Sequence, residues 1–572
     1  MITRPNVRQS SSLLVDLGVV ALLSAVLYGL MSFSKHWSEP LQAQIEIHLS
    51  LWALPGYTVL SLLRGLVAYG FSLVFALTYG YVAASSARAE RLLIPLLDVL
   101  QSIPVLGFLP AAVLALVALF PRTNIGLELA SVLMIATGQV WNLAFSFYQS
   151  LRSLPAELRE ASSVYQFNWW QRFRRVELPA ATVGLAWNSM MAMAGGWFFL
   201  MVCEAFTLGA RDFRLPGLGA YMSTAVARHA WSAMAGGILA MVLMIVAIDT
   251  CLWRPVLVWA QRFRLEDSPS IDAHGSLILR WMKRSRLVQT AMARIAHPIS
   301  EWLASGARLP SAVPLKPHAT PRRDRLVRAA TGLLLGLAAL GTAWGAWQVV
   351  RLLRHVPWTG WRAVASGSVL TLIRVAAAVV VGTLWTVPVG LWIGRSDRRC
   401  KRWQPFVQIA ASFPAPVLFP LILLALHQRG VSLGVSASAL MLLGTQWYIL
   451  FNVIAGASSI PEDLRAVTQT YHFTAAQRWR VMWWPGIFPY LLTGWVTAAG
   501  GAWNASIVAE YVSVGPQTFT APGLGSVISV AASQGHYELL AAAVLAMAIV
   551  VILLNRYLWK PLYRLAGTRY AY

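Results

Sequence analysis

The sequence predicts an all-α membrane protein with about 12 transmembrane helices, arranged as two parallel repeats of six helices. Three observations support this fold class. The 572-residue chain is 57% hydrophobic and only 12% charged, with a mean hydropathy of +0.59, which is far too apolar for a soluble protein of this length. Runs of roughly 20 apolar residues, long enough to cross a bilayer, recur along the chain. Several short motifs also occur twice at a nearly constant spacing.

The apolar runs define six predicted spans in each repeat. Those of the first repeat lie near 13–34, 57–84, 93–119, 126–150, 179–203 and 232–255, and those of the second near 327–350, 366–393, 404–426, 432–455, 485–509 and 538–558. The first run is longer than a signal-peptide core and has no small-residue cleavage site with a soluble domain after it, so we expect a retained helix. The predicted domains are the first repeat, 1–260, a basic linker, 261–325, and the second repeat, 326–572.

The net charge of +24 comes from Lys and Arg residues that gather in the loops. Most of these clusters fall on one side of the membrane if both termini are cytoplasmic, as the excess of positive charge in cytoplasmic loops requires. Anionic lipids therefore account for the charge, and we expect no nucleic-acid partner. The linker is either a simple tether or contains an amphipathic helix over 275–306 that lies on the membrane.

The duplication extends through most of the chain outside the linker. At an offset of 310 residues, Ser61-Leu62-Leu63-Arg64 matches Thr371-Leu372-Ile373-Arg374, and Ser102-Ile103-Pro104 matches Ser412-Phe413-Pro414. At an offset of 306, Trp141 matches Trp447, Gly195 matches Gly501, Trp197 matches Trp503, Glu204 matches Glu510, and Pro216-Gly217-Leu218-Gly219 matches Pro522-Gly523-Leu524-Gly525. Because each repeat has an even number of spans, both are expected to cross the membrane in the same direction.

A polar loop is also repeated, and both copies lie between apolar spans. Residues 155–179 and 461–485 are identical at nine of 25 positions, including Arg159/Arg465 and Tyr165/Tyr471. A membrane protein that carries the same polar loop in each half is expected to bind a partner there, once per half. Each loop is predicted to begin with a short surface helix, capped in the second copy by Ser459 and Glu462, which have the spacing of a capping box.

The first copy resembles the EAA loop of ABC importer permeases, in which Glu-Ala-Ala is followed by a glycine and by a closing Ile-x-Leu-Pro. Residues 160–162 read Glu-Ala-Ser, Gln166 stands at the glycine, and residues 176–179 read Val-Glu-Leu-Pro. In the second copy Ala466 stands at the glutamate and His472 at the glycine, so we expect the two loops to bind their partners unequally. The Ser/Thr-Leu-x-Arg, Ser-x-Pro and Pro-Gly-Leu-Gly motifs resemble the nitrate/sulfonate/taurine/bicarbonate type of permease, here in a fused, duplicated form.

This resemblance implies the fold of a type I ABC importer permease, which forms the transmembrane channel and works by alternating access driven by separate ATPase subunits. The implied substrate is a small anion such as nitrate, a sulfonate or bicarbonate. The implied partners are two ABC ATPase subunits on the cytoplasmic face, a periplasmic or lipid-anchored substrate-binding protein, and the lipid of a bacterial inner membrane, which the chain crosses many times with both termini in the cytoplasm. The residues implied in ATPase coupling are Glu160, Ala161, Ser162, Tyr165, Arg172, Arg465, Ala466, Tyr471 and Arg478.

The chain has no nucleotide-binding motif of its own. No Gly-x-x-x-x-Gly-Lys-Ser/Thr sequence occurs, and no Gly-Lys pair exists anywhere in the chain. We therefore expect a permease subunit that is not an enzyme and that needs no cofactor or metal, with ATP and Mg²⁺ bound by the partner ATPases.

Charged and aromatic residues within the spans are the candidates for the translocation path and its gates, because charge is costly in lipid. The path candidates are Arg64, Arg374, Trp197, Trp503 and Asn504, and the outer-gate candidates are Glu204, Glu510, Gly217 and Gly523. The two arginines either attract an anion or pair with the two glutamates. The glutamates are expected to hold the Pro-Gly-Leu-Gly loops through backbone N–H groups. Prolines such as Pro104 and Pro414 are expected to break the third and ninth spans beside a cavity.

Other classes of protein fit part of the pattern. Twelve spans in two parallel halves also describe a major facilitator-type secondary transporter, but carboxylates suited to proton coupling are few. A membrane scaffold or membrane-embedded enzyme is a further alternative, although the spans contain no evident cluster of His, Asp or Glu at helical spacing. Within the ABC class, another small solute such as an amino acid, a thiamine-like compound or a metal complex is the alternative to an anion.

Overall fold

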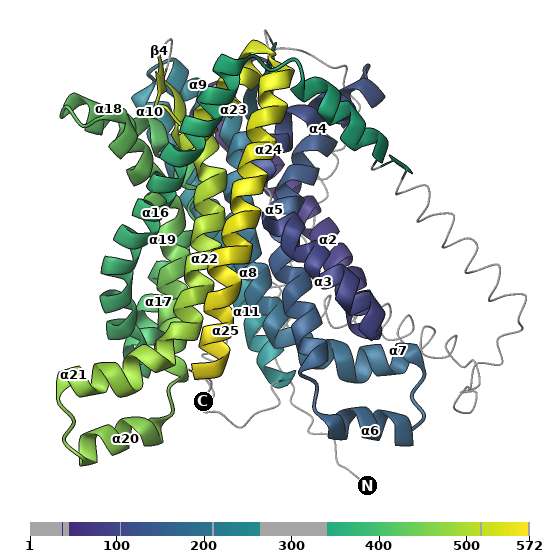
Figure 1. Ribbon diagram of the computed structural model, residues 1–572, viewed down its shortest axis with the longest axis vertical. Helices are drawn as coiled ribbons and strands as arrows, with labels where there is room; N and C mark the ends of the chain where they lie inside the picture. The colour runs from purple at the N-terminus through teal and green to yellow at the C-terminus, as the bar shows by residue number, and fades with distance from the viewer. Residues whose placement is uncertain are drawn as a thin grey trace, which may run out of the picture. The chain divides into compact units, whose positions relative to one another are not determined.

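The computed structural model of the protein describes residues 37, 45–102, 104–208, 211–263, 340–341, 343–514 and 517–569. Most of these residues are helical (Figure 1), which confirms the predicted all-α fold class. The expected span at 13–34 and the expected amphipathic helix at 275–306 lie outside the described residues. So does the linker from residue 264 onward.

The chain divides into two units. Unit 1 comprises Met1–Tyr28, Ser146–Trp187 and Thr250–Val356, and it contains the polar loop of the first repeat. Unit 2 comprises Gly29–Phe145, Asn188–Asp249 and Pro357–Tyr572, and it contains most of the first-repeat spans together with the second repeat from α16 onward. Two long helices, α5 (Ile125–Arg152) and α8 (Leu178–Cys203), begin in one unit and end in the other.

The first repeat follows the predicted order of spans. Its further elements are η1 (Leu51–Ala53), α2 (Leu54–Ser85), α3 (Ala87–Ser102), η2 (Val105–Phe108), α4 (Leu109–Leu119), α6 (Ala156–Val164), α7 (Trp169–Arg172), η3 (Phe173–Glu177), β1 (Ala205–Leu208), β2 (Arg211–Arg214), α9 (Leu218–Ala227), α10 (Trp231–Ile248), η4 (Asp249–Trp253), α11 (Arg254–Ala260) and η5 (Gln261–Phe263).

From the second span onward, the second repeat contains the same order of elements, with no counterpart of η1 or η5 among the described residues. They are α16 (Trp358–Gly394), α17 (Asp397–Ser412), η7 (Ala415–Val417), α18 (Phe419–Gln428), α19 (Leu433–Ser459), α20 (Glu462–Thr470), α21 (Ala475–Arg478), η8 (Trp479–Trp483), α22 (Trp484–Ala509), β3 (Tyr511–Val514), β4 (Gln517–Thr520), α23 (Leu524–Gln534), α24 (Tyr537–Leu554), η9 (Asn555–Trp559) and α25 (Lys560–Arg569).

The third span of each repeat is broken into two helices, as the prolines predict. In the first repeat α3 ends at Ser102 and α4 begins at Leu109, with Pro104 between them. In the second repeat α17 ends at Ser412, and Pro414 precedes the short η7. Proline lacks an N–H group and disfavours helical geometry at the residue before it, so the Ser-x-Pro motif itself accounts for the break.

The core of the second repeat is formed by α19, which packs against α16 and α22. Ile449, Val453 and Ala457 of α19 are buried in one hydrophobic cluster with residues of both neighbours. A Cβ atom at Gly390 of α16 would lie 2.7 Å from Cγ1 of Val453, so this helix pair approaches closely only because residue 390 has no side chain.

Each repeat also packs against the other within unit 2. The last span of the second repeat, α24, contacts α3, and the corresponding helix of the first repeat, α10, contacts α17, which corresponds to α3. The last span of each repeat therefore packs against the third span of the other repeat, and the two contacts are equivalent.

Seven helical stretches in the described part of the chain are long and apolar enough to cross a membrane. They are Leu51–Ser85, Ile125–Arg152, Trp169–Cys203, Trp231–Phe263, Trp358–Gly394, Leu433–Ser459 and Tyr537–Ala566. Shorter apolar helices such as α4 and α18 belong to the broken third spans. The multi-span architecture is thus present, while the total of about 12 spans stays a prediction, because the first predicted span and most of the seventh, 327–350, lie outside the described residues.

Two elements were not expected from the sequence. After its fifth span each repeat forms a β-hairpin, β1–β2 or β3–β4, with Phe206 opposite Phe213 in the first and Val512 opposite Phe519 in the second. Each hairpin is followed by a short apolar helix, α9 or α23, of 10 or 11 residues. These strands and helices are too short to produce a clear periodic signal in an apolar sequence.

The predicted cap of the second polar loop is wrong. Pro461 precedes α20, and no side-chain hydrogen bond caps this helix, so Ser459 and Glu462 do not form a capping box. Capping boxes instead begin the following helices, at Asn168 and Gln171 before α7 and at Thr474 and Gln477 before α21. The proline already fixes the backbone at the start of α20 and has no N–H group that a Glu side chain could cap.

The two residues that stand at the glycine of the EAA-loop pattern have a left-handed backbone conformation. Gln166 and His472 both have φ near 51°, immediately after α6 and α20. Glycine adopts this region without a steric penalty, whereas other residues pay roughly 1–2 kcal/mol. The sequence departs from the family pattern here, but the backbone retains the conformation that a glycine would favour.

We expect His472→Gly to raise the apparent unfolding temperature of the purified protein, because it removes a side chain from a left-handed backbone position just after α20. His472→Val should reduce the free energy of unfolding by about 1 kcal/mol and so lower the unfolding temperature, because a β-branched residue tolerates this region poorly. Tryptophan fluorescence during heating measures both. The control is Gln469→Gly, within α20, which should destabilise. Equal stability of the Gly and Val variants would contradict the prediction.

Candidate functional site

A buried ionic cluster joins three segments of the first repeat within unit 2. Arg64 of α2 donates from Nε and Nη2 to the two oxygens of Glu128 on α5, at 2.8 and 2.7 Å. Its Nη1 atom donates to Glu204, which follows α8. The side chains of Arg64, Glu128 and Glu204 are each at most 1% exposed. One guanidinium thus holds two carboxylates by charge-assisted hydrogen bonds, an arrangement in which removal of any partner leaves a buried charge.

The same glutamate fixes the Pro-Gly-Leu-Gly loop. Glu204 accepts hydrogen bonds from the hydroxyl of Ser61, at 2.7 Å, and from the backbone N–H of Gly219, at 2.6 Å. Ser61 in turn accepts the N–H of Leu218, at 2.8 Å. A Cβ atom at Gly217 would overlap the Glu204 carboxylate. The loop therefore lies directly on the glutamate, and Gly217 is required for this close approach.

The second repeat reproduces this arrangement with one difference. Thr371 and Arg374 of α16 donate to Glu510 at 2.8 and 2.6 Å, and Glu510 accepts the N–H of Gly525 at 2.8 Å. Gly523 lies against the Glu510 carboxylate as Gly217 does against Glu204. The position equivalent to Glu128 is 306 residues further on, at Gly434. The second cluster accordingly lacks the second carboxylate.

A cavity of about 230 Å³ lies in unit 2 between residues of both repeats. Its wall is aromatic and amide-rich, and none of the described residues that line it is Lys, Arg, Asp or Glu. Polar and aromatic members are Gln101, Thr137, Trp141, Asn142, Phe198, Phe199, Gln408, Phe413, Thr445, Trp447, Tyr448, Phe451, Thr497, Trp503, Asn504, Asn555 and Trp559. The side-chain oxygen of Asn504 accepts the N–H of Leu106 at 3.4 Å, which ties α22 of one repeat to η2 of the other beside the cavity.

The path candidates separate into two groups. Trp503 and Asn504 line the cavity, whereas Arg64, Arg374 and Trp197 do not. Trp197 packs against Gly65, where an added Cβ would lie 2.9 Å from Cζ3 of its indole. The arginines pair with the glutamates, which was the second of the two roles considered for them. The structure thus brings the arginine and gate candidates together and places them outside the cavity.

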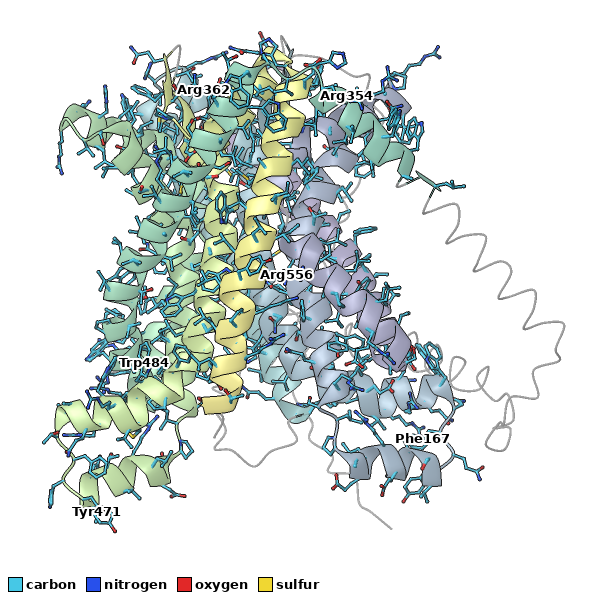
Figure 2. All side chains as sticks on the ribbon, viewed as in Figure 1. Phe167, Arg354, Arg362, Tyr471, Trp484 and Arg556 are labelled. Carbon is cyan, nitrogen blue, oxygen red and sulfur yellow. The ribbon has the colours of Figure 1, made fainter. Side chains whose placement is uncertain are left out.

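α20 and α21, which belong to the polar loop of the second repeat, lie at one end of unit 2, and the hairpin β3–β4 lies at the opposite end (Figure 1). Figure 2 places Tyr471 at the tip of this loop and Arg362 near the hairpin end. Arg465 anchors α20, because its Nη2 atom donates to the carbonyl of Ala457 at 2.8 Å. Tyr471 is 72% exposed, and Ala466 and Arg478 are exposed as well, so this face of the loop is open to a partner.

The base of this loop is rich in positive charge. Arg395 lies over the ring of Trp483 at 4.5 Å, and its backbone carbonyl accepts a hydrogen bond from Arg465. Burial, together with the neighbouring charges of Arg399 and Arg478, lowers the pKa of the Arg395 guanidinium from its usual value. An acidic partner surface would relieve this repulsion.

The polar loop of the first repeat, in unit 1, has the same construction. Arg159 donates to the carbonyl of Leu151 at 2.9 Å, eight residues earlier, as Arg465 does in the other loop. Glu160 and Tyr165 are exposed and Ala161 is half-buried, while Arg172 pairs with Glu177 at 2.7 Å. Ser162 is instead buried, and its hydroxyl donates to the carbonyl of Arg159, so it faces its own chain.

Each loop joins the following span through a π-helical turn, η3 in the first repeat and η8 in the second. Both turns have five residues and are 306 positions apart. Such turns are rare and frequently occur at functional sites. Their repetition indicates that both connections between loop and span are built in the same way.

Glu128 and the roles of Ser61 and Thr371 were not predicted from the sequence. Glu128 is a carboxylate within a predicted span, which is by itself a signal of function or pairing, but it has no counterpart in the second repeat and so does not stand out in the duplication. The aromatic cavity residues Trp447 and Tyr448 were also missed, because aromatic residues are common throughout this apolar chain.

These features define a polytopic membrane protein made of two related halves with paired polar loops. The chain belongs to the family described as the binding-protein-dependent transport system inner membrane component, which matches residues 76–255 and 386–557. The two matches cover more than half of the chain and lie within the two predicted repeats, and the family is a transport component rather than an enzyme.

Three curated relatives are similar to parts of this chain. The nitrate import permease protein NrtB of Synechocystis sp. (strain ATCC 27184 / PCC 6803 / Kazusa) is 26% identical over 188 residues, or 33% of this chain and 65% of the relative. The putative aliphatic sulfonates transport permease protein SsuC of Bacillus subtilis (strain 168) is 27% identical over 150 residues, or 26% and 51%. The bicarbonate transport system permease protein CmpB of the same Synechocystis strain is 27% identical over 196 residues, or 34% and 65%. The chain thus spans less than two thirds of the length of each.

We expect Gly523→Ala to destabilise the protein by about 1–3 kcal/mol, because the added methyl group displaces the carboxylate that holds the loop before α23. The apparent unfolding temperature of the detergent-solubilised chain measures the loss. Gly70→Ala is the matched control, since an added Cβ there meets no atom within 4 Å and should leave stability unchanged or raised. If Gly523→Ala lost less stability than Gly70→Ala, the close contact between Gly523 and the Glu510 carboxylate would be contradicted.

Proposed function

We propose that this chain forms the transmembrane channel of an ATP-driven importer for a small anion such as nitrate, a sulfonate or bicarbonate. The single observation that carries the proposal is the pair of polar loops, each anchored by an equivalent arginine (Arg159 or Arg465) and each exposing a tyrosine at its tip. Membership of the family supports a role in transport, and the names of the three relatives support an anionic substrate.

Two separate ATPase subunits would bind α6 and α20, with ATP and Mg²⁺ on those subunits. The absence of a phosphate-binding motif in the sequence supports this division of labour. The two loops differ at Glu160 and Ala466, so the ATPases would bind with unequal affinity. The π-helical turns η3 and η8 would transmit the movement of each loop to the following span.

The loops would lie on the cytoplasmic side of a bacterial inner membrane, with both termini on that side, because most basic residues are then cytoplasmic. The hairpin end of unit 2, which carries β3–β4 and α23, would face a periplasmic or lipid-anchored substrate-binding protein. The loops held by Glu204 and Glu510 would form the gate at that end.

The cavity of about 230 Å³ would be the translocation path, because it is lined by both repeats and relative motion of the repeats would open it to either side. Its walls contain amide and hydroxyl donors such as Asn142, Thr445 and Asn504, which can bind an anion without a fixed positive charge.

A second candidate substrate follows from the aromatic residues of this wall. Trp141, Trp447, Tyr448 and Trp503 line the cavity, and aromatic faces attract quaternary ammonium groups. A methylated ammonium compound or zwitterion is therefore the alternative to an anion. Competition between nitrate and glycine betaine for ATP-dependent uptake into proteoliposomes discriminates the two.

We expect Glu160→Arg to reduce co-purification of the chain with its proposed ATPase partner, because it reverses a charge on the exposed face of α6. In the same assay, Ala466→Arg should reduce ATPase binding through the second loop. The difference in co-purification between the two variants measures how unequally the two loops bind their ATPases. The assay is a pull-down of the detergent-solubilised chain.

The control for this experiment is Arg362→Glu at the hairpin end, which should leave ATPase binding unchanged (Figure 2). If no ATPase binds the wild-type chain and uptake into vesicles follows a proton or sodium gradient without ATP, the importer proposal fails, and a secondary transporter takes its place.

We expect Gly500→Phe to abolish uptake while leaving ATPase binding intact, because Gly500 lines the cavity and an added Cβ there meets no atom within 4 Å. A phenyl group would fill a large part of the open volume. Gly70→Phe, on an exposed face of α2, is the control and should transport normally. Undiminished uptake by the Gly500 variant would exclude this cavity as the path.

A further inference from the structure

Several polar side chains in the wall of the cavity are already hydrogen-bonded to the protein itself. The hydroxyls of Thr137, Thr445 and Thr497 each donate to a carbonyl of their own helix, at 2.8 Å. Asn504 donates from Nδ2 to a carbonyl one turn earlier, at 3.2 Å, and its oxygen accepts a backbone N–H of the other repeat. These four residues therefore hold the wall together with most of their hydrogen-bonding capacity.

Asn142 and Tyr448 line the same cavity without such bonds. Neither side chain forms a hydrogen bond with another of the described residues. Asn142 lies on α5 and Tyr448 on α19, and they are 306 positions apart, the offset that also relates Trp141 to Trp447. Each repeat thus contributes one uncommitted donor from an equivalent position, an amide N–H from the first and a phenol O–H from the second.

The side chain of Tyr448 reaches from the second repeat to the first. A Cβ atom at Gly501 of α22 would lie 3.3 Å from Cε2 of the Tyr448 ring, and one at Gly195 of α8 would lie 3.5 Å from its hydroxyl oxygen. Gly195 and Gly501 are themselves equivalent, 306 positions apart. The ring therefore lies across the matching glycines of the two fifth spans, and its close packing on Gly501 fixes the position of the hydroxyl.

The place in front of this hydroxyl is open because residue 195 has no side chain. Outside its own helix, a Cβ atom at Gly195 would meet two atoms within 4 Å, the Tyr448 hydroxyl and, at 4.0 Å, the carbonyl oxygen of Gly138. Both distances are ordinary contacts, so a small group fits there. Gly138 precedes Asn142 by one turn on the same face of α5. The open place is thus bounded by the phenol of one repeat and by the α5 face that carries Asn142.

The chemistry of this pair favours an anion. A donor that stays without a partner away from bulk water is unfavourable, so a ligand with acceptor oxygens lowers the free energy of the wall. Hydrogen bonds to a charged acceptor are roughly twice as strong as those between neutral groups. None of the described lining residues is acidic, so no described carboxylate in the wall opposes the charge.

We propose that Asn142 and Tyr448 donate hydrogen bonds to oxygen atoms of the transported anion, one donor from each repeat, with the anion in front of Gly195. This inference rests on the importer function proposed above and assigns the residues that recognise its substrate. Because one donor belongs to each repeat, both hold the anion only while the repeats lie close together. Movement of the repeats apart removes one of the two bonds and so weakens binding.

The first test needs no ATPase. The unfolding temperature of the detergent-solubilised full-length chain is followed by light scattering while sodium chloride is replaced by sodium nitrate, bicarbonate or methanesulfonate at constant ionic strength. The wild-type temperature should rise to a plateau with at least one of these anions. Tyr448→Phe keeps the ring and removes the hydroxyl, so the concentration at half of the rise should increase roughly tenfold or more. Asn142→Asp keeps the shape but presents a carboxylate, and should abolish the response.

A matched control is Tyr490→Phe, the same change on α22 at a residue outside the described lining of the cavity, which should respond as the wild type does. The exchange variant combines Asn142→Tyr with Tyr448→Asn. It should restore a response that Tyr448→Asn alone lacks, because the equivalent glycines Gly195 and Gly501 let a ring cross from the other repeat. A purely structural role of Tyr448 predicts no such rescue of anion binding.

Uptake by the assembled importer in proteoliposomes gives the second readout. Tyr448→Phe should raise KM for the responding anion roughly tenfold and leave the maximal rate nearly unchanged. If an anion stabilises the wild type, but Tyr448→Phe and Asn142→Asp respond to it as Tyr490→Phe does, the assignment of this pair is wrong while the importer function stands. If none of the three anions stabilises the wild type or is taken up by it, the proposed anion import fails, and this inference fails with it.

Discussion

The ion pair between a span arginine and the glutamate after the fifth span organises each repeat at its hairpin end. Arg64 with Glu204, and Arg374 with Glu510, connect the second span to the residue at which the fifth span ends. The same carboxylates receive backbone N–H groups of the following loop, so one buried charge positions two spans and the loop together. Since a buried carboxylate without its partners is strongly unfavourable, the loop can leave this position only if the ion pair is solvated at the same time.

The polar loop of each repeat is held by more exposed contacts. Arginine–carbonyl hydrogen bonds anchor α6 and α20, two for each helix, and most of the remaining loop surface is exposed. Each repeat thus combines a buried ion pair with a polar loop that exposes its side chains. Unit 2 also contains a cavity lined by both repeats, and none of the described residues that line it is Lys, Arg, Asp or Glu.

Much of this organisation could be predicted from the sequence. Apolar runs predicted the spans that the structure describes, and Ser-x-Pro predicted the broken third spans, because proline acts locally on its own backbone. The duplication singled out Arg64 and Glu204, which it showed twice, and their pairing was one of the two roles expected for the arginine. Glu128 could not be found in that way, because its counterpart is glycine.

The cavity could not be predicted from the sequence either, since it depends on how α8, α19 and α22 pack. Nothing local distinguishes Tyr448 from other aromatic residues of this chain. The capping box was wrongly predicted from the Ser-x-x-Glu spacing of Ser459 and Glu462, because the proline between them fixes the start of α20 and has no N–H group to be capped.

The exchanged packing of the last spans has a consequence for biosynthesis. α3 leaves the ribosome long before α24, which is one of its neighbours. The first half therefore has an unfilled side in the membrane until α24 has been translated, and in the meantime lipid or an insertion chaperone must cover that side. Linking the two halves in one polypeptide shortens this wait, because the missing helix arrives tethered rather than by a chance encounter in the bilayer.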